Sequence, residues 1–491
     1  MYTIGYDLGS SSVKVALVET ATGKKIAVIN EPSKEMEILA LHSDWAEQDP
    51  DMWWSHICTA TKRIIKEAKI KPAEITGIGI SYQMHGLVIV DKDGKPLRNS
   101  IIWCDSRAVA IGNKAYDDLG HDFCASALLN APGNFTASKL KWVRDNEPKI
   151  YESIFKYMLP GDYIAYKLTG ELVTTKNGLS EGTLWNYKTE SVANELLDYY
   201  GIDRSYTPDI VENFTNQGEV HTEAATATGL PEGISVNYRS GDQPNNALSL
   251  NILKPGEVAA TGGTSGVIYA VTDQSEFKEI QKVNHFAHVN YTEKKPVVGR
   301  LLNINGAGIQ YRWLKNNSAA QSYDEMNDQA AQVNIGAEGA VVIPFGNGAE
   351  RMFNNRTIGT HFCNLNLNTH TNAHLYRAAL EGIAFSFVFG MDILKNDNTA
   401  IDVIRAGNDN LFRSEIFANT VATLIGQEIE IYNTTGAVGA ARAAGLTDGD
   451  FTRFGESITQ NDHVKTYSPT TDKAAYVAAY EHWKKQLQTF I

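Results

Sequence analysis

Two segments of the chain, about 250 residues apart, combine apolar runs and small polar turns in the same way. In residues 4–18, β-branched and other apolar side chains flank a turn of Gly and Ser at residues 9–12. In residues 258–271 they flank a turn of Gly, Thr and Ser at residues 262–266. The pattern predicts strand, tight turn and strand in each segment. Its repetition predicts two related lobes, one in each half of the chain.

The rest of the first half predicts alternating helices and strands. Asp49-Pro50 suits the N-cap and first position of a helix, and apolar residues recur at helical spacing through residues 53–68. Residues 75–82 form a nearly continuous apolar run, which is typical of a central strand. Asp93-Gly94 predicts a hairpin turn after a strand at 86–91. Further predicted elements are a strand at 24–30 and a helix that ends before Pro148.

The second half continues in the same alternation, so we expect an α/β fold. Because 491 residues exceed what one core usually covers, two large domains are expected. Pro and Gly interrupt residues 204–241, and we place the boundary at 238–241, which gives domains of residues 1–240 and 241–491. Residues 371–394 predict a long helix. The last predicted helix carries a stripe of Val477, Tyr480, Trp483, Leu487 and Phe490.

The composition is that of a globular enzyme, with 43% hydrophobic and 21% charged residues. A formal net charge of −13 argues against a nucleic-acid or anionic-membrane partner, although backbone amides and a metal can still bind phosphate. The four cysteines show no metal-ligand spacing, so we expect free thiols. No apolar run is long enough to span a membrane, and the first strand begins at residue 2. We therefore expect a cytoplasmic protein.

Asp7 ends the first apolar strand, directly before the first turn. A carboxylate there can hold Mg²⁺ through water while turn amides and hydroxyls face phosphate oxygens. The alternative is that Asp7 only hydrogen-bonds its own turn, but the second copy of the pattern favours phosphate binding. The candidate phosphate-binding residues are Gly9, Ser10, Ser11 and Ser12 in the first turn and Gly263, Thr264 and Ser265 in the second.

Asp242 follows a predicted strand and precedes a helix whose first turn suits Pro244. A carboxylate in this place projects from a rigid element between the two lobes. There it could accept the proton of a substrate hydroxyl during phosphoryl transfer. The alternative is that Asp242 only caps the helix. Spacing alone leaves both interpretations open.

Polar side chains also gather after two apolar runs of the first half. Directed hydrogen-bonding groups beside apolar walls suit a polyhydroxylated ligand, because each hydroxyl needs a partner and the carbon skeleton needs a surface. The alternative for each residue alone is a satisfied hydrogen bond in a loop, and for His85 alone this is the favoured interpretation. The candidate substrate-binding residues are Gln83, Met84 and His85 in the first cluster and Trp103, Asp105 and Arg107 in the second.

Several longer motifs resemble those of the FGGY family of carbohydrate kinases, and within it those of the xylulokinases. The most specific are Trp45-Ala46-Glu47-Gln48-Asp49-Pro50 and Gln83-Met84-His85-Gly86. The resemblance spans nearly the whole chain. Its other motifs are Asp7-Leu8-Gly9-Ser10-Ser11-Ser12-Val13-Lys14, Trp53-Trp54, Trp103-Cys104-Asp105-Ser106-Arg107, Pro132-Gly133-Asn134-Phe135-Thr136-Ala137-Ser138-Lys139-Leu140-Lys141-Trp142, Leu159-Pro160-Gly161-Asp162-Tyr163, Gly241-Asp242, Gly263-Thr264-Ser265-Gly266, Ala379-Leu380-Glu381-Gly382 and Gly439-Ala440-Ala441.

The resemblance implies a fold like that of actin, hexokinase and the 70-kDa heat-shock chaperones. In that fold two ribonuclease-H-like domains enclose a deep cleft that binds ATP and Mg²⁺. The implied reaction transfers phosphate from ATP to D-xylulose and gives D-xylulose 5-phosphate and ADP. The alternatives are another sugar or polyol kinase, such as a ribulokinase, or a nucleotide-dependent switch that transfers nothing to a sugar. Similar kinases are often dimers, so a homodimer is a further expectation.

The resemblance also implies residue roles. Asp242 corresponds to the general base and, with Asp7, to the carboxylates that hold the metal through water. Lys14 joins the residues of the first phosphate turn. The chain departs from the family at residues 405–410, where relatives carry three glycines against adenosine and this chain retains one. Gly407 and Asn408 are the candidate nucleotide-binding residues there.

Overall fold

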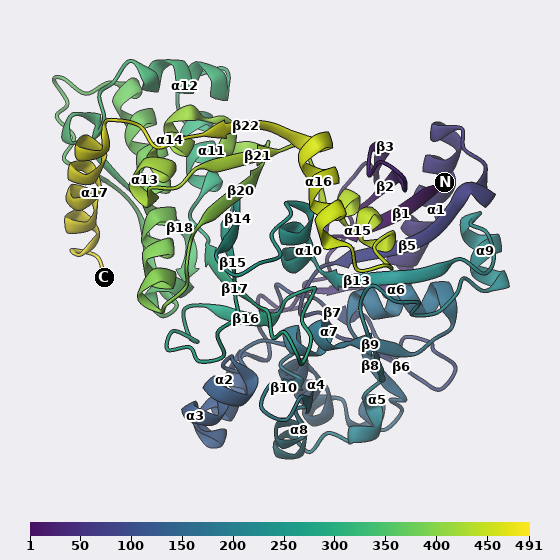
Figure 1. Ribbon diagram of the computed structural model, residues 1–491. Coiled ribbons are helices and arrows are strands. Elements are labelled where there is room, and N and C mark those ends of the chain that lie inside the picture. Colours follow the sequence, from purple (N-terminus) through teal and green to yellow (C-terminus); the bar gives the residue numbers. More distant parts are fainter.

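The computed structural model describes residues 1–491, apart from the side chain of Asn410. It contains two α/β domains, each built on a mixed sheet (Figure 1). The first sheet has, in order, β13 (Ser235–Gly241), β5 (Ile75–Tyr82), β1 (Tyr2–Leu8), β2 (Val13–Glu19) and β3 (Lys25–Glu31). The second has β16 (Asn284–Ala287), β17 (Val298–Ile304), β15 (Gly266–Thr272), β14 (Glu257–Gly262), β20 (Val403–Gly407), β21 (Ile429–Tyr432) and β22 (His463–Tyr467).

Both predicted glycine-hydroxyl hairpins are confirmed. β1 pairs antiparallel with β2, and β14 pairs antiparallel with β15. β5 lies between β1 and β13 and runs parallel to both, and its apolar run is almost wholly buried. The strand predicted at 24–30 is β3. The helix predicted after Asp49 is α1 (Pro50–Ala68), with Asp49 as its N-cap.

The hairpin predicted at Asp93-Gly94 is present but short. Gly94 N donates to Asp91 O and Asp91 N donates to Lys95 O across the turn, and Leu97 N donates to Ile89 O. The returning chain forms only an isolated bridge, between Val90 and Pro96, and a proline has no N–H to continue a ladder. β6 (Val88–Val90) also pairs along its length with β8 (Lys156–Met158), a strand distant in sequence that the sequence did not predict.

The stripe predicted for the last helix is wrong at one position. In α17 (Lys473–Leu487) the buried side chains are Tyr476, Tyr480, Trp483 and Leu487, whereas Val477 is 40% exposed. Steps of four, three and four residues keep all four buried side chains on one helix face. Trp483 Nε1 also donates a hydrogen bond at 3.0 Å to Val342 O. This bond turns the buried face of the helix toward the core of the second domain.

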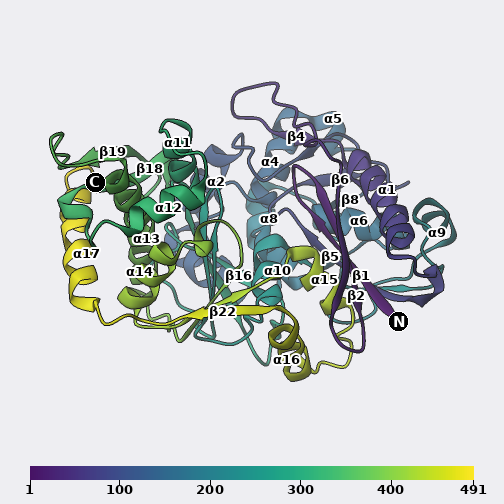
Figure 2. The ribbon, with the colours of Figure 1, turned by 90° about the horizontal axis from the view of Figure 1, so that it is seen from above.

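Helix α15 (Gly436–Ala444) comes late in the chain but packs on the sheet of the first domain. Both views show it against β1, β2 and β5 (Figures 1 and 2). The sheet presents glycines to this helix: a Cβ at Gly5 would overlap Ala437 O, and a Cβ at Gly79 would overlap Ala440 O. The first domain is therefore completed by a segment from the second half of the sequence.

Helix α10 (Asp242–Ser249) follows β13 directly and lies between the two domains (Figure 2). The boundary predicted at 238–241 falls on the last residues of β13, which belongs to the first sheet. The second sheet begins only at Glu257. Since α10 and α15 connect both units, the division at residues 240 and 241 remains a prediction.

The segment between β5 and β13 forms a mainly helical region in the lower part of Figure 1. Its apolar core also includes Phe277, Ile280 and Val298 of the second domain, which fixes this region to both domains. Its helices include α4 (Thr136–Asn146), α6 (Pro160–Thr169) and α7 (Lys176–Glu181).

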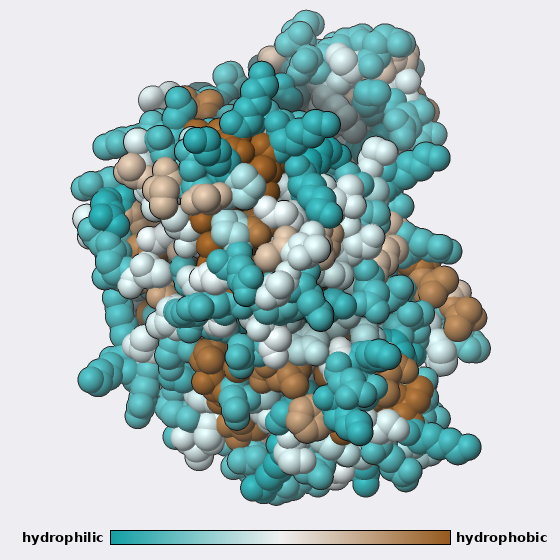
Figure 3. Space-filling view, turned by 90° about the vertical axis from the view of Figure 1, so that its right-hand side faces the viewer, coloured by the Kyte–Doolittle hydropathy of each residue, from teal (hydrophilic) through white to brown (hydrophobic). Residues whose placement is uncertain are grey.

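Helices also pack on the second sheet. The helix predicted at 371–394 is α13 (Asn372–Asn396), and it packs with α14 (Glu415–Ile425), α17 and β18 (Val341–Glu350) in one large core. None of the described helices has the length and apolar character to cross a membrane. Polar side chains dominate the face shown in Figure 3, and the hydrophobic groups on that face are separate from one another.

Candidate active site

The first glycine-hydroxyl turn holds Asp7 between the first sheet and α15. Gly9 N donates to Ser12 O at 3.0 Å and closes the turn. Asp7 Oδ1 accepts a hydrogen bond from Ser81 Oγ of β5 at 2.9 Å. The other oxygen lies beside the start of α15, because a Cβ at Gly436 would be 2.7 Å from Asp7 Oδ2. The carboxylate thus has a fixed place at the end of β1.

The remaining residues predicted for the first turn stay accessible. Lys14 lies opposite Asp7 in the hairpin register, and its side chain is exposed. Ser11 is exposed as well, and Ser10 is partly exposed. Trp103, which is 51% exposed, points its Nε1 at Ser10 Oγ, 3.3 Å away. The structure therefore brings Trp103, predicted as a substrate contact, to the turn predicted to bind phosphate.

The second turn is attached to the start of α11 (Gly308–Asn316). Gly308 N donates to Gly263 O, and Ile309 N donates to Thr264 O, both at 3.0 Å. A Cβ at Gly308 would overlap Gly263 O, so this contact requires glycine. Gly263, Thr264 and Ser265 all keep part of their surface exposed. The turn is hydrogen-bonded to α11 on one side and is exposed on the other.

Helix α10 bonds to α15 on one side and to the second hairpin on the other. Asn245 Nδ2 donates at 2.9 Å to Gly436 O, beside Asp7. One residue later, Asn246 Nδ2 donates at 3.1 Å to Thr261 Oγ1, at the end of β14. Two successive amides of one helix therefore join the start of α15, where Asp7 lies, to the second hairpin.

Asp242 is the first residue of α10 and is partly exposed. Burial of its carboxyl group and the negative charge of Asp7 raise the pKa of Asp242 to about 7, against the opposing effects of Gln243 and Lys14. The two carboxylates are thus close enough to interact. A group with a pKa near neutrality suits a base that takes a proton and later releases it.

His85 has a strained backbone, with a φ of 61°. Its ring lies against Phe135 and, across the domains, against Phe286 of β16, with centroid distances of 4.7 and 5.4 Å. Burial and the charge of Lys139 lower the pKa of His85 to about 3, so the ring is neutral. Nδ1 lies 2.8 Å from Glu181 O and must donate to that carbonyl. Nε2 is then an acceptor, and no described residue uses it.

Gln83 and Met84 are less accessible than His85. Gln83 is 2% exposed, and its Nε2 donates at 3.3 Å to Gln48 Oε1. Gln48 Nε2 in turn donates at 2.6 Å to Ser10 O, which ties the segment before His85 to the first turn. Met84 is 4% exposed and packs in an apolar cluster that spans both domains.

Asp105 is fully buried, and neighbouring groups hydrogen-bond to both oxygens of its carboxylate. Ala46 N donates to Oδ2 at 2.7 Å, and Arg107 donates to both oxygens from its backbone and its guanidinium. Arg107 also pairs with Glu47 Oε1 at 2.7 Å and lies 3.9 Å above the Trp45 ring. Asp105 and Arg107 thus bind each other and the segment of Ala46 and Glu47. Their contact with a substrate stays a prediction.

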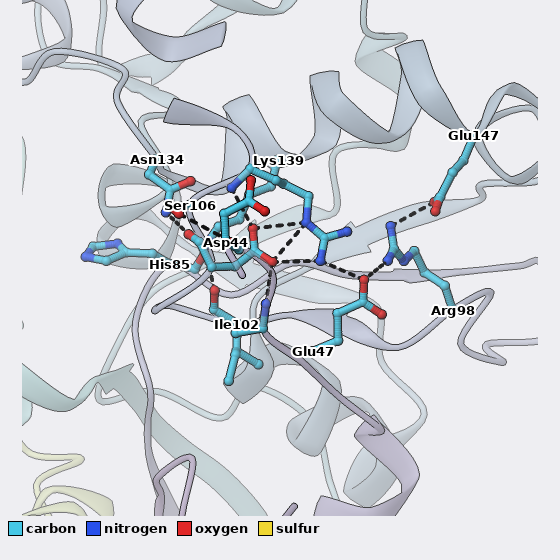
Figure 4. A network of polar contacts seen from close by, with 12 residues as sticks. Asp44, Glu47, His85, Arg98, Ile102, Ser106, Asn134, Lys139 and Glu147 are labelled. Atoms are coloured by element: carbon cyan, nitrogen blue, oxygen red, sulfur yellow. Dashed lines mark hydrogen bonds and ion pairs between the residues drawn. The ribbon is translucent and has the colours of Figure 1, made fainter. Parts of the chain in front are cut away.

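Lys139, which sequence reasoning gave no role, lies beneath His85. It is fully buried on α4, and its Nζ donates to His85 O at 2.8 Å and to Ile102 O at 2.9 Å (Figure 4). Burial lowers the pKa of Lys139 to about 7. The signal in the sequence is a lysine among the buried positions of a helix, beside Leu140 and Val143.

A pocket of about 450 Å³ adjoins the second turn. Sequence reasoning missed it, because its walls come from five separate segments. Gly407 and Asn408 are not among its lining residues: Gly407 ends β20 and Asn408 follows it, where the neighbouring Asp409 feels the charge of Lys14 in the first domain. The pocket is lined by Gly262, Gly263, Thr264, Gly308, Tyr311, Arg312, Tyr323, Asp324, Asn327, Leu380, Leu411, Arg413 and Ser414.

The residues present fit a metal nucleotide. Asp7 and Asp242 offer neighbouring carboxylates whose mutual repulsion a divalent cation would relieve. The two turns expose backbone and hydroxyl groups, and the pocket beside the second turn has room for a nucleoside. The side chain of Asn410, within the atypical segment 405–410, lies outside the described residues.

Known proteins match the whole chain. The chain is 28% identical to the xylulose kinase of Staphylococcus xylosus, over 98% of this chain and 99% of that one. The structure superposes on a xylulose kinase from Brucella ovis with a TM-score of 0.88, at 26% identity over 100% and 99% of the two chains. It superposes equally well on the Plasmodium falciparum glycerol kinase with ADP, with a TM-score of 0.88 at 20% identity over 100% and 98%.

Residues 2–249 match the N-terminal domain of the FGGY carbohydrate kinases, and residues 258–447 match the C-terminal domain. These two matches leave out only short segments and the last helices of the second domain. They agree with the two α/β domains described above and with the predicted actin-like architecture. The chain therefore belongs to the FGGY family of carbohydrate kinases.

Proposed function

We propose that the protein phosphorylates the ketopentose D-xylulose with ATP, giving D-xylulose 5-phosphate and ADP. Support comes from its relatives, since the similar curated proteins are xylulose kinases at 26–28% identity over most of the chain. The observation that carries the proposal is the pairing of Asp242 with Asp7 at the junction of two phosphate-binding turns, with neutral His85 nearby.

In the proposed reaction Asp242 accepts the proton of the terminal sugar hydroxyl as that oxygen attacks the γ-phosphorus of ATP. The bond from the γ-phosphorus to the bridging oxygen breaks, and ADP leaves. His85 Nε2 accepts a hydrogen bond from another hydroxyl of the sugar and so orients it. Asp7 and Asp242 would hold Mg²⁺ through water, and the ion when bound would neutralise charge on the phosphates.

The two turns supply the remaining proposed contacts. Gly9 and the serines beside it, with Lys14, face one side of the phosphates, and Gly263 and Thr264 face the other. The pocket beside the second turn takes the nucleoside. Gly407 and Asn408 approach from the strand end beside Asp409. The predicted homodimer remains a proposal, which the mass of the protein in solution would test.

A panel of sugars tests this proposal. ADP formation is measured with D-xylulose, D-ribulose, L-ribulose, D-fructose, glycerol and gluconate, each over a range of concentrations. We expect kcat/KM for D-xylulose to exceed that for every other compound by at least roughly 10-fold, which is the effect of one well-placed contact. A higher value for glycerol or gluconate would overturn the proposed substrate. ADP formation that no sugar changes would point to a nucleotide switch instead.

A further inference from the structure

Glu181 connects the sugar-binding and proton-accepting parts of the site. It ends α7 and is 1% exposed. Its backbone oxygen accepts the hydrogen bond from His85 Nδ1 at 2.8 Å. Its side chain lies against Gly241, the residue before Asp242: a Cβ at Gly241 would overlap Glu181 Oε2 and lie 2.5 Å from Met84 Cγ. One residue therefore touches both neighbouring segments, its backbone touching His85 and its carboxyl group touching Gly241.

The carboxyl group of Glu181 has no counter-charge. No described lysine, arginine or histidine forms an ion pair with it, and its buried Oε1 has no hydrogen-bond partner among the described residues. Burial and then the negative charge of Asp242 raise the pKa of Glu181 well above its ordinary value, against the opposing effects of the His85 backbone N–H and the Tyr82 hydroxyl.

Burying a carboxyl group without an ion pair is costly, and this one fills the space that Gly241 leaves open. Gly241 has ordinary backbone angles, with a φ of −55°, so its conformation does not require glycine. What requires glycine is the Glu181 carboxyl group and the Met84 side chain, both packed against its Cα. The pair Gly241–Glu181 is thus a steric unit directly beneath the first residue of α10.

We propose that Glu181 is a positioning residue of this kinase, whose buried side chain supports the Gly241–Asp242 backbone while its backbone oxygen orients the His85 ring. The proposal rests on the proposed function, because it concerns the same sugar and the same base. Substitution of the side chain removes the support at Gly241 but leaves the backbone oxygen in place. The effect should therefore fall on kcat and spare the KM for the sugar.

Two variants of Glu181 separate shape from charge. We expect Glu181→Ala to lower kcat about 10- to 100-fold, as expected for a displaced base, with KM for the sugar within about 3-fold. Glu181→Gln keeps the shape without a charge and should restore kcat to within about 3-fold. If Gln is as impaired as Ala, an ionised carboxylate is needed and the proposal is wrong. Unchanged kcat in Ala would also overturn it.

A second pair of variants covers the case in which Glu181→Ala does not fold. Gly241→Ala places a methyl group where Glu181 Oε2 lies and should lower kcat in the same way. In the double variant Gly241→Ala/Glu181→Ala, the methyl group still meets Met84 Cγ but no longer meets the Glu181 carboxyl group. The kcat should therefore recover in part, by at least about 3-fold over Gly241→Ala alone. If the losses of kcat in the two single variants instead multiply in the double variant, Gly241 and Glu181 do not share one space and the proposal is wrong.

The control is a buried acid outside the site. Asp462 is 4% exposed and pairs with Arg442 at 2.5 Å. Asp462→Ala should lower the melting temperature while kcat of the folded protein stays unchanged. All variants are assayed with the sugar that the wild-type protein phosphorylates best. If that sugar is not D-xylulose, the proposed substrate fails, and the ratio of kcat values still decides the role of Glu181.

Discussion

At the scale of single residues, Asp242 combines a local position with a charge environment that the chain builds from distant parts. Its own segment places it at the start of a helix. Asp7 comes from a strand more than 200 residues earlier and helps to raise the pKa of Asp242 to about 7. A residue that only capped the helix would need no such neighbour, so the geometry favours the catalytic interpretation.

Asp242→Asn tests that interpretation. The amide keeps the shape of the side chain but cannot accept the proton of the sugar hydroxyl. We expect sugar-dependent ADP formation to fall about 10²- to 10⁴-fold, the usual contribution of a general base. Sugar binding, measured by calorimetry without nucleotide, should stay within a few-fold. Near-normal turnover would exclude Asp242 as the general base.

Lys139→Met tests the support beneath His85. Loss of the amine leaves His85 O and Ile102 O without their donor and loosens a backbone that already has a positive φ. We expect the KM for the sugar to rise roughly 10-fold while kcat changes less, because the base is not involved. Lys141→Met is the matched control on the same helix, since Lys141 pairs only with Asp145 near the surface.

Lys139 also predicts how stability depends on pH. Burial lowers its pKa to about 7 in the folded protein, whereas an unfolded chain keeps the ordinary value near 10.5. Between these values the unfolded chain binds the extra proton, so the free energy of unfolding contributed by this residue rises with pH. Urea unfolding at pH 7, 8 and 9 should therefore favour the wild type increasingly over Lys139→Met. A difference that is constant or shrinks would contradict the burial of an uncharged amine.

At the scale of elements, the close approach of α15 to the first sheet depends on glycine. Gly79→Ala would place a Cβ on Ala440 O, a backbone atom that can move only with its helix. We expect a loss of about 1–3 kcal/mol in the free energy of unfolding, as for other overpacked interiors. Gly445→Ala, just after the same helix, meets no atom closer than 3.4 Å and should change stability little. Denaturant titrations of both variants decide between them.

Elements set by local signals agree with the sequence, and those set by distant partners do not. The hairpin β1–β2 needs only its own apolar runs and turn. β6 is different, because its main partner β8 lies about 70 residues later and no local pattern identifies it. The stripe of α17 is likewise decided by contact with another element, which selects Tyr476 over Val477.

At the scale of the whole molecule, α10 and α15 join the two domains, and the segment between β5 and β13 packs against both. We therefore expect calorimetry to show one main unfolding transition, because separating the domains would expose the sheet face that α15 covers. A truncation after residue 253 should leave that face open and fail to fold. Two well-separated transitions in the full chain would contradict this coupling.

The sequence by itself determined the family, the alternation of strands and helices and the two turns, because these depend on residue types at fixed local spacing. It also singled out Asp7, Asp242 and His85. Only the tertiary structure decided the acceptor nitrogen of His85, the raised pKa of Glu181 beside Gly241 and the support from Lys139. Each of these depends on burial and on neighbours that are remote in the chain, and a proton's free energy is set by those surroundings.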